Sequence, residues 1–202
     1  VSRGLGDVYK RQVPDPAKAA KDPKDIASIE QLFLTGQHLE QYRHATYDPT
    51  EYYKEALRRE PGDIRCNNAM GLWLMRKGQF AMAEPYFRKA IGTQTERNPN
   101  PYDGEPHYNL GWSCLMQGKT DEAYDAFFKS AWNAAWQDAA YYNLAAIDCR
   151  RGNFEKALDL IDRSLVRNWH HHKARQLKAS ILRHLGPVSY THLRAHETLA
   201  NL

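Results

Sequence analysis

The sequence has few cysteines and no long hydrophobic run. Its 202 residues include three cysteines, at positions 66, 114 and 149, a spacing that offers neither a disulfide framework nor a Cys-x-x-Cys metal site. We therefore expect reduced thiols and a cytoplasmic protein. No segment approaches the roughly 20 consecutive apolar residues that span a bilayer, so no membrane association is expected. With 42% apolar residues, the chain can still bury the core of one or two domains.

A strong excess of charge of one sign is also missing. The formal net charge is +4, and residues 1–12 carry three basic residues and one acid, whereas residues 187–202 carry one of each. The stretch between them therefore has a net charge of only +2. This is too little for the basic surface of a nucleic-acid-binding protein, so no nucleic acid is expected as a partner.

The two ends differ from the rest of the chain. The strings GDVYKRQ and VSYTHLRAHET resemble translated sequencing-adapter read-through, and the first residue is Val rather than Met. We expect residues 1–12 and 187–202 to be artefactual additions to a fragment, with native tails as the alternative. A helical repeat interrupted near residue 186 supports the same interpretation.

The dominant feature is an internal repeat of 34 residues. The pairs separated by this spacing are Asn109 and Asn143, Leu110 and Leu144, Gly118 and Gly152, and Ala123 and Ala157. An earlier unit matches the same frame at a spacing of 40, through Gly71 and Gly111, Gly78 and Gly118, and Phe87 and Phe127. The six extra residues lie in the connector Gly92–Gly104, which is rich in turn formers.

Each repeat has the pattern of a helical hairpin. In the unit around Gly111, Asp103 is placed to cap a helix with Pro106 in its first turn, and Gly118 is placed to end it. The small residue at Gly111 lets a second helix approach, and the ring of Phe127 fills the space beneath. The sequence therefore predicts an all-α protein.

These residues resemble the tetratricopeptide repeat family. Its pattern of an aromatic residue, Leu-Gly, then Gly, Ala and a second aromatic residue is met by Leu110, Gly111, Gly118, Ala123 and Phe127. The resemblance implies an α-α superhelix of antiparallel helical hairpins. It divides the chain into a degenerate helical unit (13–63), three hairpins (64–169) and the first helix of a truncated repeat (170–186).

The degenerate unit carries its own helix signals. A first helix is expected from about Ile26 to His44. Asp48 then resembles an N-cap with a reciprocal Glu51, and a second helix carrying Tyr53 follows. Terminal repeats are often atypical because they cap the stack.

A binding groove follows from the resemblance, because the first helices of this family line a concave surface. The candidate groove residues are Arg65, Asn68, Arg76, Tyr108, Asn109, Trp112, Met116, Tyr142, Asn143, Arg150 and Lys173. An aromatic centre flanked by arginines is typical of peptide-binding surfaces. The alternative for Trp112 and Met116 is simple packing against neighbouring helices.

One known ligand class does not fit this groove. Members of the family that bind chaperone tails hold a carboxylate with a set of Lys, Asn and Arg side chains. Only Asn109, Asn143 and Lys173 match that set, so a chaperone tail is not expected.

Catalytic and metal-binding patterns are weak. Three consecutive histidines at 170–172 point about 100° apart on a helix and cannot share one ion well. The spacing of Asp103, His107 and Ser113 does not indicate a catalytic triad. Trp132 and Trp136 are expected to lock neighbouring hairpins together. We therefore expect no enzyme activity in this chain, no metal and no cofactor.

A second resemblance extends over most of residues 13–186. Strings such as GQHLEQYRHATYDPTEYYKEALRREPGDIR resemble the C-terminal array of large bacterial proteins, in which an uncharacterised β-rich domain precedes the repeats. That family is associated with carbohydrate utilisation. Two functions are therefore considered. One is a protein-interaction scaffold that binds a peptide or partner domain. The other is a structural or oligomerisation appendage of a carbohydrate-processing enzyme, docked on the missing N-terminal domain of the same chain.

Overall fold

The computed structural model describes residues 18–43 and 45–200, with side chains through residue 186. Within these ranges the elements are helical and no strand occurs, which confirms the all-α prediction. The helices are η2 (Pro23–Asp25), α1 (Ile29–Gln41), α2 (Pro49–Arg59), α3 (Ile64–Arg76), α4 (Phe80–Thr95), α5 (Glu105–Met116), α6 (Thr120–Ser130), η3 (Ala134–Trp136), α7 (Gln137–Arg150), α8 (Phe154–Arg167) and α9 (His172–Ala200).

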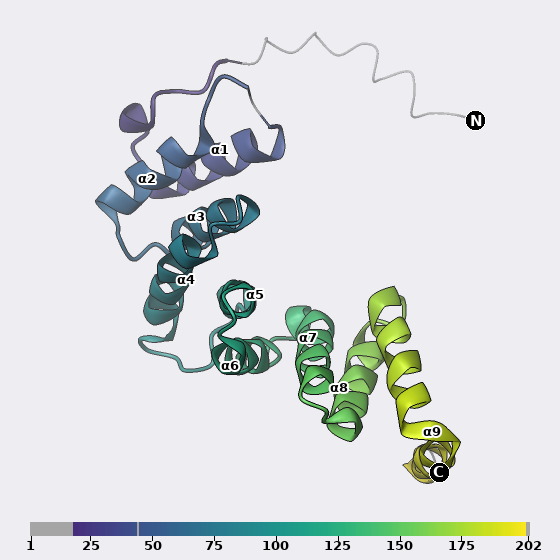
Figure 1. Ribbon diagram of the computed structural model, residues 1–202. Coiled ribbons are helices and arrows are strands. Elements are labelled where there is room, and N and C mark those ends of the chain that lie inside the picture. Colours follow the sequence, from purple (N-terminus) through teal and green to yellow (C-terminus); the bar gives the residue numbers. More distant parts are fainter. Residues whose placement is uncertain (1–17, 44, 201–202) are drawn as a thin grey trace, which may run out of the picture.

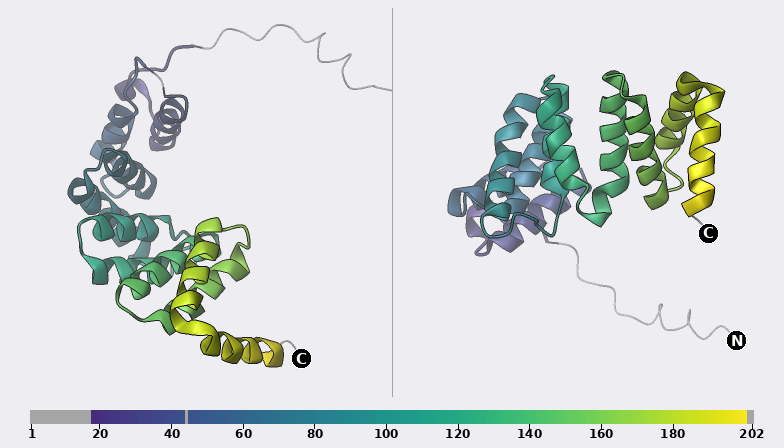
Figure 2. Two further views of the ribbon diagram at one scale, coloured as in Figure 1. Left: turned by 45° about the vertical axis from the view of Figure 1, so that its right-hand side comes forward. Right: turned by 90° about the horizontal axis from the view of Figure 1, so that it is seen from below.

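Consecutive helices pair as antiparallel hairpins that stack in chain order. Figure 1 shows the hairpins along an arc, with α1, α3 and α5 toward its concave side and α2, α4 and α6 outside. A second view shows the C-shaped course of the chain (Figure 2). The first helices touch one another, α1 with α3 and α3 with α5, so they form the inner wall of the superhelix.

A glycine in the left-handed region closes the first helix of each of the last four hairpins. The values of φ are +74° at Gly78, +78° at Gly118, +80° at Gly152 and +80° at Gly186. After Gly118, the amide of Lys119 donates to the carbonyl of Cys114 at 3.0 Å, which satisfies a carbonyl that the helix leaves open. The next helix can therefore turn back along the first.

Helices α3 and α5 each pack closely against an aromatic residue of their partner helix. An added Cβ at Gly111 would lie 2.7 Å from the ring of Phe127, and one at Gly71 would lie 2.5 Å from the ring of Phe87. In the α7–α8 hairpin the equivalent positions hold Ala145 and the smaller Ile161, both fully buried. The change from glycine to alanine therefore coincides with loss of the ring.

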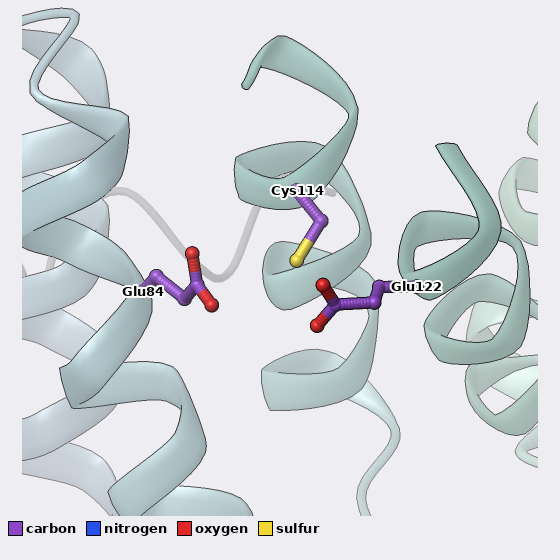
Figure 3. A group of neighbouring side chains, drawn as sticks. All are labelled: Glu84, Cys114 and Glu122. Atoms are coloured by element: carbon purple, nitrogen blue, oxygen red, sulfur yellow. The ribbon is translucent and has the colours of Figure 1, made fainter. Parts of the chain in front are cut away.

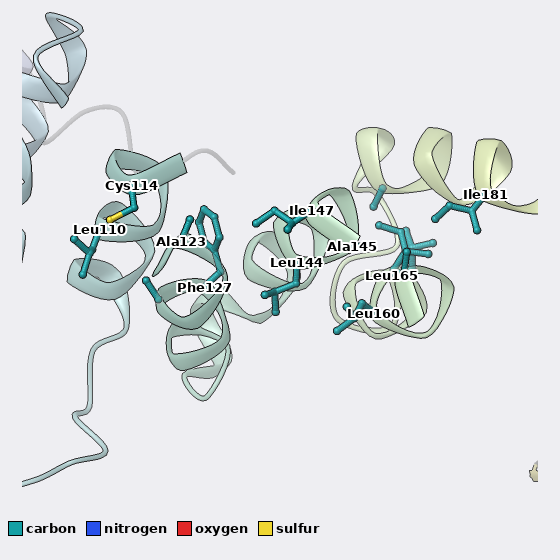
Figure 4. Packing of buried hydrophobic residues seen from close by; sticks show 14 of the residues in the cluster. Leu110, Cys114, Ala123, Phe127, Leu144, Ala145, Ile147, Leu160, Leu165 and Ile181 are labelled. Carbon is teal, nitrogen blue, oxygen red and sulfur yellow. The ribbon is translucent and has the colours of Figure 1, made fainter. Parts of the chain in front are cut away.

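The hydrophobic core runs continuously through the later hairpins. Figure 4 shows it passing from Leu110 and Phe127 through Leu144 to Ile181 on α9. A second cluster around Tyr52 and Tyr53 fills the first hairpin. Each hairpin is thus buried mainly against its chain neighbours, as expected for a repeat architecture.

The degenerate unit differs in detail from the prediction. Helix α1 begins at Ile29, where the hydroxyl of Ser28 accepts from the amide of Gln31 at 3.1 Å. The cap at Asp48 is confirmed by its contact with the amide of Thr50 at 2.9 Å. Among the described residues no hydrogen bond joins the carboxylate of Glu51 to the amide of Asp48, and that carboxylate pairs with Lys54 at 2.8 Å.

The last helix, α9, starts later than expected and is broken along its length. Helix α9 begins at His172, two residues later than expected, and its backbone breaks sharply at Gly186 (φ 80°, ψ 171°) before continuing to Ala200. The string at 1–12 lies outside the described residues, and from 187 only the backbone through residue 200 is described. Among the described residues, no helix combines the length and apolar character needed to cross a membrane.

Candidate functional site

A hollow of about 330 Å³ opens between α1, α3 and the start of α5. Helix α3 supplies several of its lining residues, and three of them are the predicted groove residues of this helix. They are Arg65, Asn68 and Arg76, and Leu72 of the same helix also lines the hollow. Helix α1 adds Phe33, Gln37 and Glu40. Asp103 from the segment before α5 and Glu105, the first residue of α5, also line it. The hollow therefore has an apolar floor and a rim of charged and amide side chains.

The two arginines of the rim are held by acids of neighbouring segments. The guanidinium of Arg65 pairs with Glu30, lies 3.5 Å from Asp63 and stands 5.1 Å from the centroid of the Phe33 ring. The guanidinium of Arg65 thus lies over the ring of Phe33, and both residues line the hollow. Its charge is largely balanced by the two carboxylates.

Arg76 is balanced in the same way at the other end of α3. Its guanidinium pairs with one carboxylate oxygen of Glu40, and the other oxygen accepts from the hydroxyl of Tyr53 at 2.9 Å. Burial lowers the pKa of Arg76 from its ordinary value. The contribution of α1 to this site could not be read from the sequence repeat, because α1 belongs to the degenerate unit.

The predicted asparagines lie between first helices. Nδ2 of Asn109 donates to Oδ1 of Asn68 at 2.9 Å, joining α5 to α3. Nδ2 of Asn143 donates to the hydroxyl of Tyr108 at 3.2 Å, joining α7 to α5. All three asparagines are buried. Their amides therefore fix the spacing of the inner wall, on which the groove depends.

The aromatic centre packs on its neighbours and keeps part of its surface open. Tyr108 lies 4.8 Å from the ring of Trp136 between centroids, and Trp112 meets Phe127 edge-on at 6.0 Å. Both Tyr108 and Trp112 are half-buried. Trp112 thus packs against Phe127, and part of its side chain stays accessible.

Trp132 and Trp136, both predicted to lock neighbouring hairpins together, differ in their surroundings. Trp136 locks adjacent hairpins through its contact with Tyr108, as expected. Trp132 does not lock them, because its side chain is 59% exposed and carries the ammonium of Lys129 at 4.0 Å from the ring centroid.

The remaining predicted groove residues lie farther along the array. Met116 is 53% exposed at the end of α5. Arg150 and Lys173 are exposed on α7 and α9, with no ion pair among the described residues. The ring of Tyr142 lies 4.9 Å from that of His171.

The three consecutive histidines do not converge. His171 packs between Tyr142 and Asp138, whose carboxylate oxygen lies 3.9 Å from its Nδ1. His170 and His172 are exposed. The helix geometry assumed in the prediction was wrong for His170 and His171, because both precede α9, which begins at His172.

A group of two carboxylates and a thiol lies between α4, α5 and α6 (Figure 3). Oε1 of Glu84 accepts from Arg88 at 2.8 Å, and Oε2 accepts from Lys119 at 2.7 Å. The third member, Glu122, pairs with Arg88, and the thiol of Cys114 is fully buried. Both oxygens of Glu84 are thus occupied, and the group acts as an ion-pair network that joins two hairpins.

The charge state of this network follows from its contacts. Burial alone would raise the pKa of Glu84, but hydrogen bonds from Lys119, Arg88 and Gln117 outweigh it and lower the pKa to about 2. Burial raises the pKa of the Cys114 thiol. The carboxylate therefore stays ionised and the thiol stays protonated at neutral pH.

Helical hairpins closed by left-handed glycines and stacked into a curved inner wall define an α-solenoid of the tetratricopeptide type. Solved structures confirm this fold. PilW, described as a widely conserved type IV pilus biogenesis factor, is 24% identical, with 89% of this chain and 79% of that chain covered and a TM-score of 0.62. MamA from Desulfovibrio magneticus RS-1 is 19% identical, with coverage of 86% and 89% and a TM-score of 0.63.

A third solved structure with a similar fold is that of YrrB. YrrB, titled a TPR protein with an unusual peptide-binding site, is 23% identical over 75% of both chains, with a TM-score of 0.59. No protein-family model matches the chain. These likenesses therefore define the fold of the protein.

Proposed function

We propose that this chain is a non-catalytic scaffold that binds a segment of a partner protein along the concave groove. The hollow between α1, α3 and α5 is the observation that carries the proposal, because it lies on the inner wall where first helices converge. Its volume of about 330 Å³ falls at the lower end of the range for ligand pockets. The peptide-binding description of YrrB supports this proposal.

The groove has the chemistry of a protein interface. The half-buried rings of Tyr108 and Trp112 and the exposed Met116 extend the apolar surface beyond the hollow. Aromatic side chains anchored by neighbouring packing bind with little loss of side-chain entropy. Arg150 and Lys173 place polar groups farther along the same array.

The groove can be tested with peptides selected from a random dodecapeptide phage library. We expect selected peptides to lose about tenfold or more in affinity for Met116→Glu, because a charge would be placed in the apolar path. The matched control is Met82→Glu on the outer helix α4, where Met82 is 59% exposed. Affinities are measured by fluorescence anisotropy.

A second variant tests the aromatic centre. Trp112→Ala combined with Tyr142→Ala should abolish binding of the same peptides while leaving helical circular dichroism intact. Equal affinity of the peptides for wild type and all groove variants would contradict a groove-binding scaffold.

The second candidate function is a structural appendage of a larger bacterial carbohydrate-processing protein. The extended sequence resemblance over residues 13–186 favours it. In that case the same inner wall would contact a domain of its own chain. Recovery of the complete open reading frame, followed by crosslinking of Met116→Cys in the full chain, distinguishes an internal partner from an external one.

A further inference from the structure

The charge balance of the hollow differs from the one its arginines suggest. Arg65 is paired with Glu30 and Asp63, and Arg76 is paired with Glu40. Both cations on the α3 side of the hollow therefore already have carboxylate partners. An incoming acid would have to compete with these carboxylates for either guanidinium.

The facing wall carries acids without such partners. Glu105, the first residue of α5, lines the hollow, and no cation pairs with it among the residues that the structure describes. Asp103 beside it accepts the amide of Glu105 at 2.9 Å, a hydrogen bond that leaves its negative charge in place. The uncompensated charge of the hollow is therefore negative.

The floor suits the stem of a long side chain. Phe33 and Leu72 are half-buried and line the hollow. The guanidinium of Arg65 lies over the ring of Phe33, so Leu72 is the apolar surface offered to a ligand. Lys and Arg bury their methylene stems against apolar surface while the charged head reaches a polar rim. The apolar floor and the acidic wall together match both parts of such a side chain.

We propose that the hollow receives a lysine or arginine side chain from an extended segment of a partner protein. Its stem lies against Leu72, and its charged head is directed toward Glu105 and Asp103, away from the guanidinium of Arg65 over the Phe33 ring. This inference rests on the proposed scaffold function and adds the sign of the charge that the groove selects. An acidic side chain in the same place would face Glu105, Asp103 and Glu40 without a free cation.

The test uses the same random dodecapeptide phage library against the full chain. Wild type should enrich Lys and Arg above the unselected library. Glu105→Gln should reduce the affinity of the selected basic peptides about two- to fivefold, the range for a partly exposed ion pair. Glu105→Lys should reverse the selection and enrich Asp and Glu.

The control removes an equivalent acid elsewhere. Glu155 is exposed in the first turn of α8, as Glu105 lies in the first turn of α5, so Glu155→Gln matches the effect on the helix terminus. It should leave the selected peptides unchanged. Circular dichroism of each variant confirms that the helices are intact.

The outcomes separate the two proposals. Selected peptides that depend on Met116 but show no basic enrichment, or that bind Glu105→Gln as tightly as wild type, would overturn the charge assignment and leave the scaffold function standing. No enrichment of any peptide would overturn both.

Discussion

The ring of Phe127 occupies the space that a side chain at position 111 would need. An added Cβ at Gly111 would lie 2.7 Å from both Cδ1 and Cε1 of Phe127, closer than real Cβ contacts allow. The ring is fully buried and is also met by Tyr108 at 5.5 Å and Trp112 at 6.0 Å between centroids. Glycine here lets α5 approach α6 while the same ring supports the aromatic centre of the groove.

Gly111→Ala is therefore expected to destabilise the protein despite the better helix propensity of alanine. Overpacking against a buried ring costs about 1–3 kcal/mol, which outweighs a propensity gain of about 1 kcal/mol. Gly111→Leu should cost more. The free energy of unfolding is measured by urea denaturation.

Gly92 provides the matched control for this substitution. It lies within α4 with nothing within 4 Å of an added Cβ. Gly92→Ala should therefore stabilise the protein by up to about 1 kcal/mol. A Gly111→Ala variant that is as stable as Gly92→Ala would contradict the close packing of α5 on α6.

Glu84 should make the free energy of unfolding depend on pH in the acid range. Its pKa is about 2 in the folded protein, against an ordinary value of 4.5. The folded state thus favours the ionised form, so its stabilising contribution is complete above about pH 4.5 and is lost as the pH falls toward 2. Glu84→Gln should lower stability at pH 7 and weaken the pH dependence within this window.

The measurement is urea unfolding at several pH values between 2 and 7. Asp125→Asn is the control, because Asp125 is exposed on α6 and has no ion pair among the described residues. It should leave the slope between pH 4.5 and 2 nearly unchanged. A slope for Glu84→Gln equal to that of wild type would show that the network does not hold this carboxylate ionised.

His107 should make the free energy of unfolding depend on pH between about 6.5 and 4. Burial, with a smaller effect of Lys129, lowers its pKa to about 4 from 6.5, although Asp103 opposes the shift. Between these values the unfolded chain takes up a proton that the folded protein does not, so stability falls as the pH decreases from 6.5 to 4. His107→Gln should flatten this part of the profile.

The exposed His170 is the control for His107. His170→Gln should leave the profile between pH 6.5 and 4 close to that of wild type, because this ring is accessible to water. Urea unfolding in buffers of constant ionic strength supplies the measurement. An unchanged slope in His107→Gln would contradict a histidine held neutral by its surroundings.

The fold could be predicted where the repeat is regular. Gly111 and Phe127 recur from Gly71 and Phe87 at a fixed spacing, and each pair marks one hairpin. The first hairpin contains a similar pair, because an added Cβ at Gly36 would lie 2.6 Å from the ring of Tyr53. Gly36 precedes Gly71 by 35 residues, and Tyr53 precedes Phe87 by 34 residues. This spacing close to 34 was the signal that could have assigned the first hairpin to the same repeat.

The site could be predicted only in part. The family resemblance assigned Arg65, Asn68 and Arg76 to a concave groove, and these three residues line the hollow. It could not show that acids of α1 and the α2–α3 connection balance the arginines, since such contacts depend on how the hairpins stack. The sequence also could not show which residues of a first helix face the groove and which contact a neighbouring first helix. Asn109 and Asn143 are of the second kind.

The glycine turns have a consequence for how such a protein changes in length. Gly78, Gly118 and Gly152 adopt nearly the same backbone conformation, with φ between +74° and +80°, and each joins one hairpin's two helices without involving more distant parts of the chain. Duplication or deletion of a whole hairpin therefore leaves the glycine turns of the other hairpins intact. Evolution can lengthen or shorten the inner wall in modular steps, matching partners of different reach.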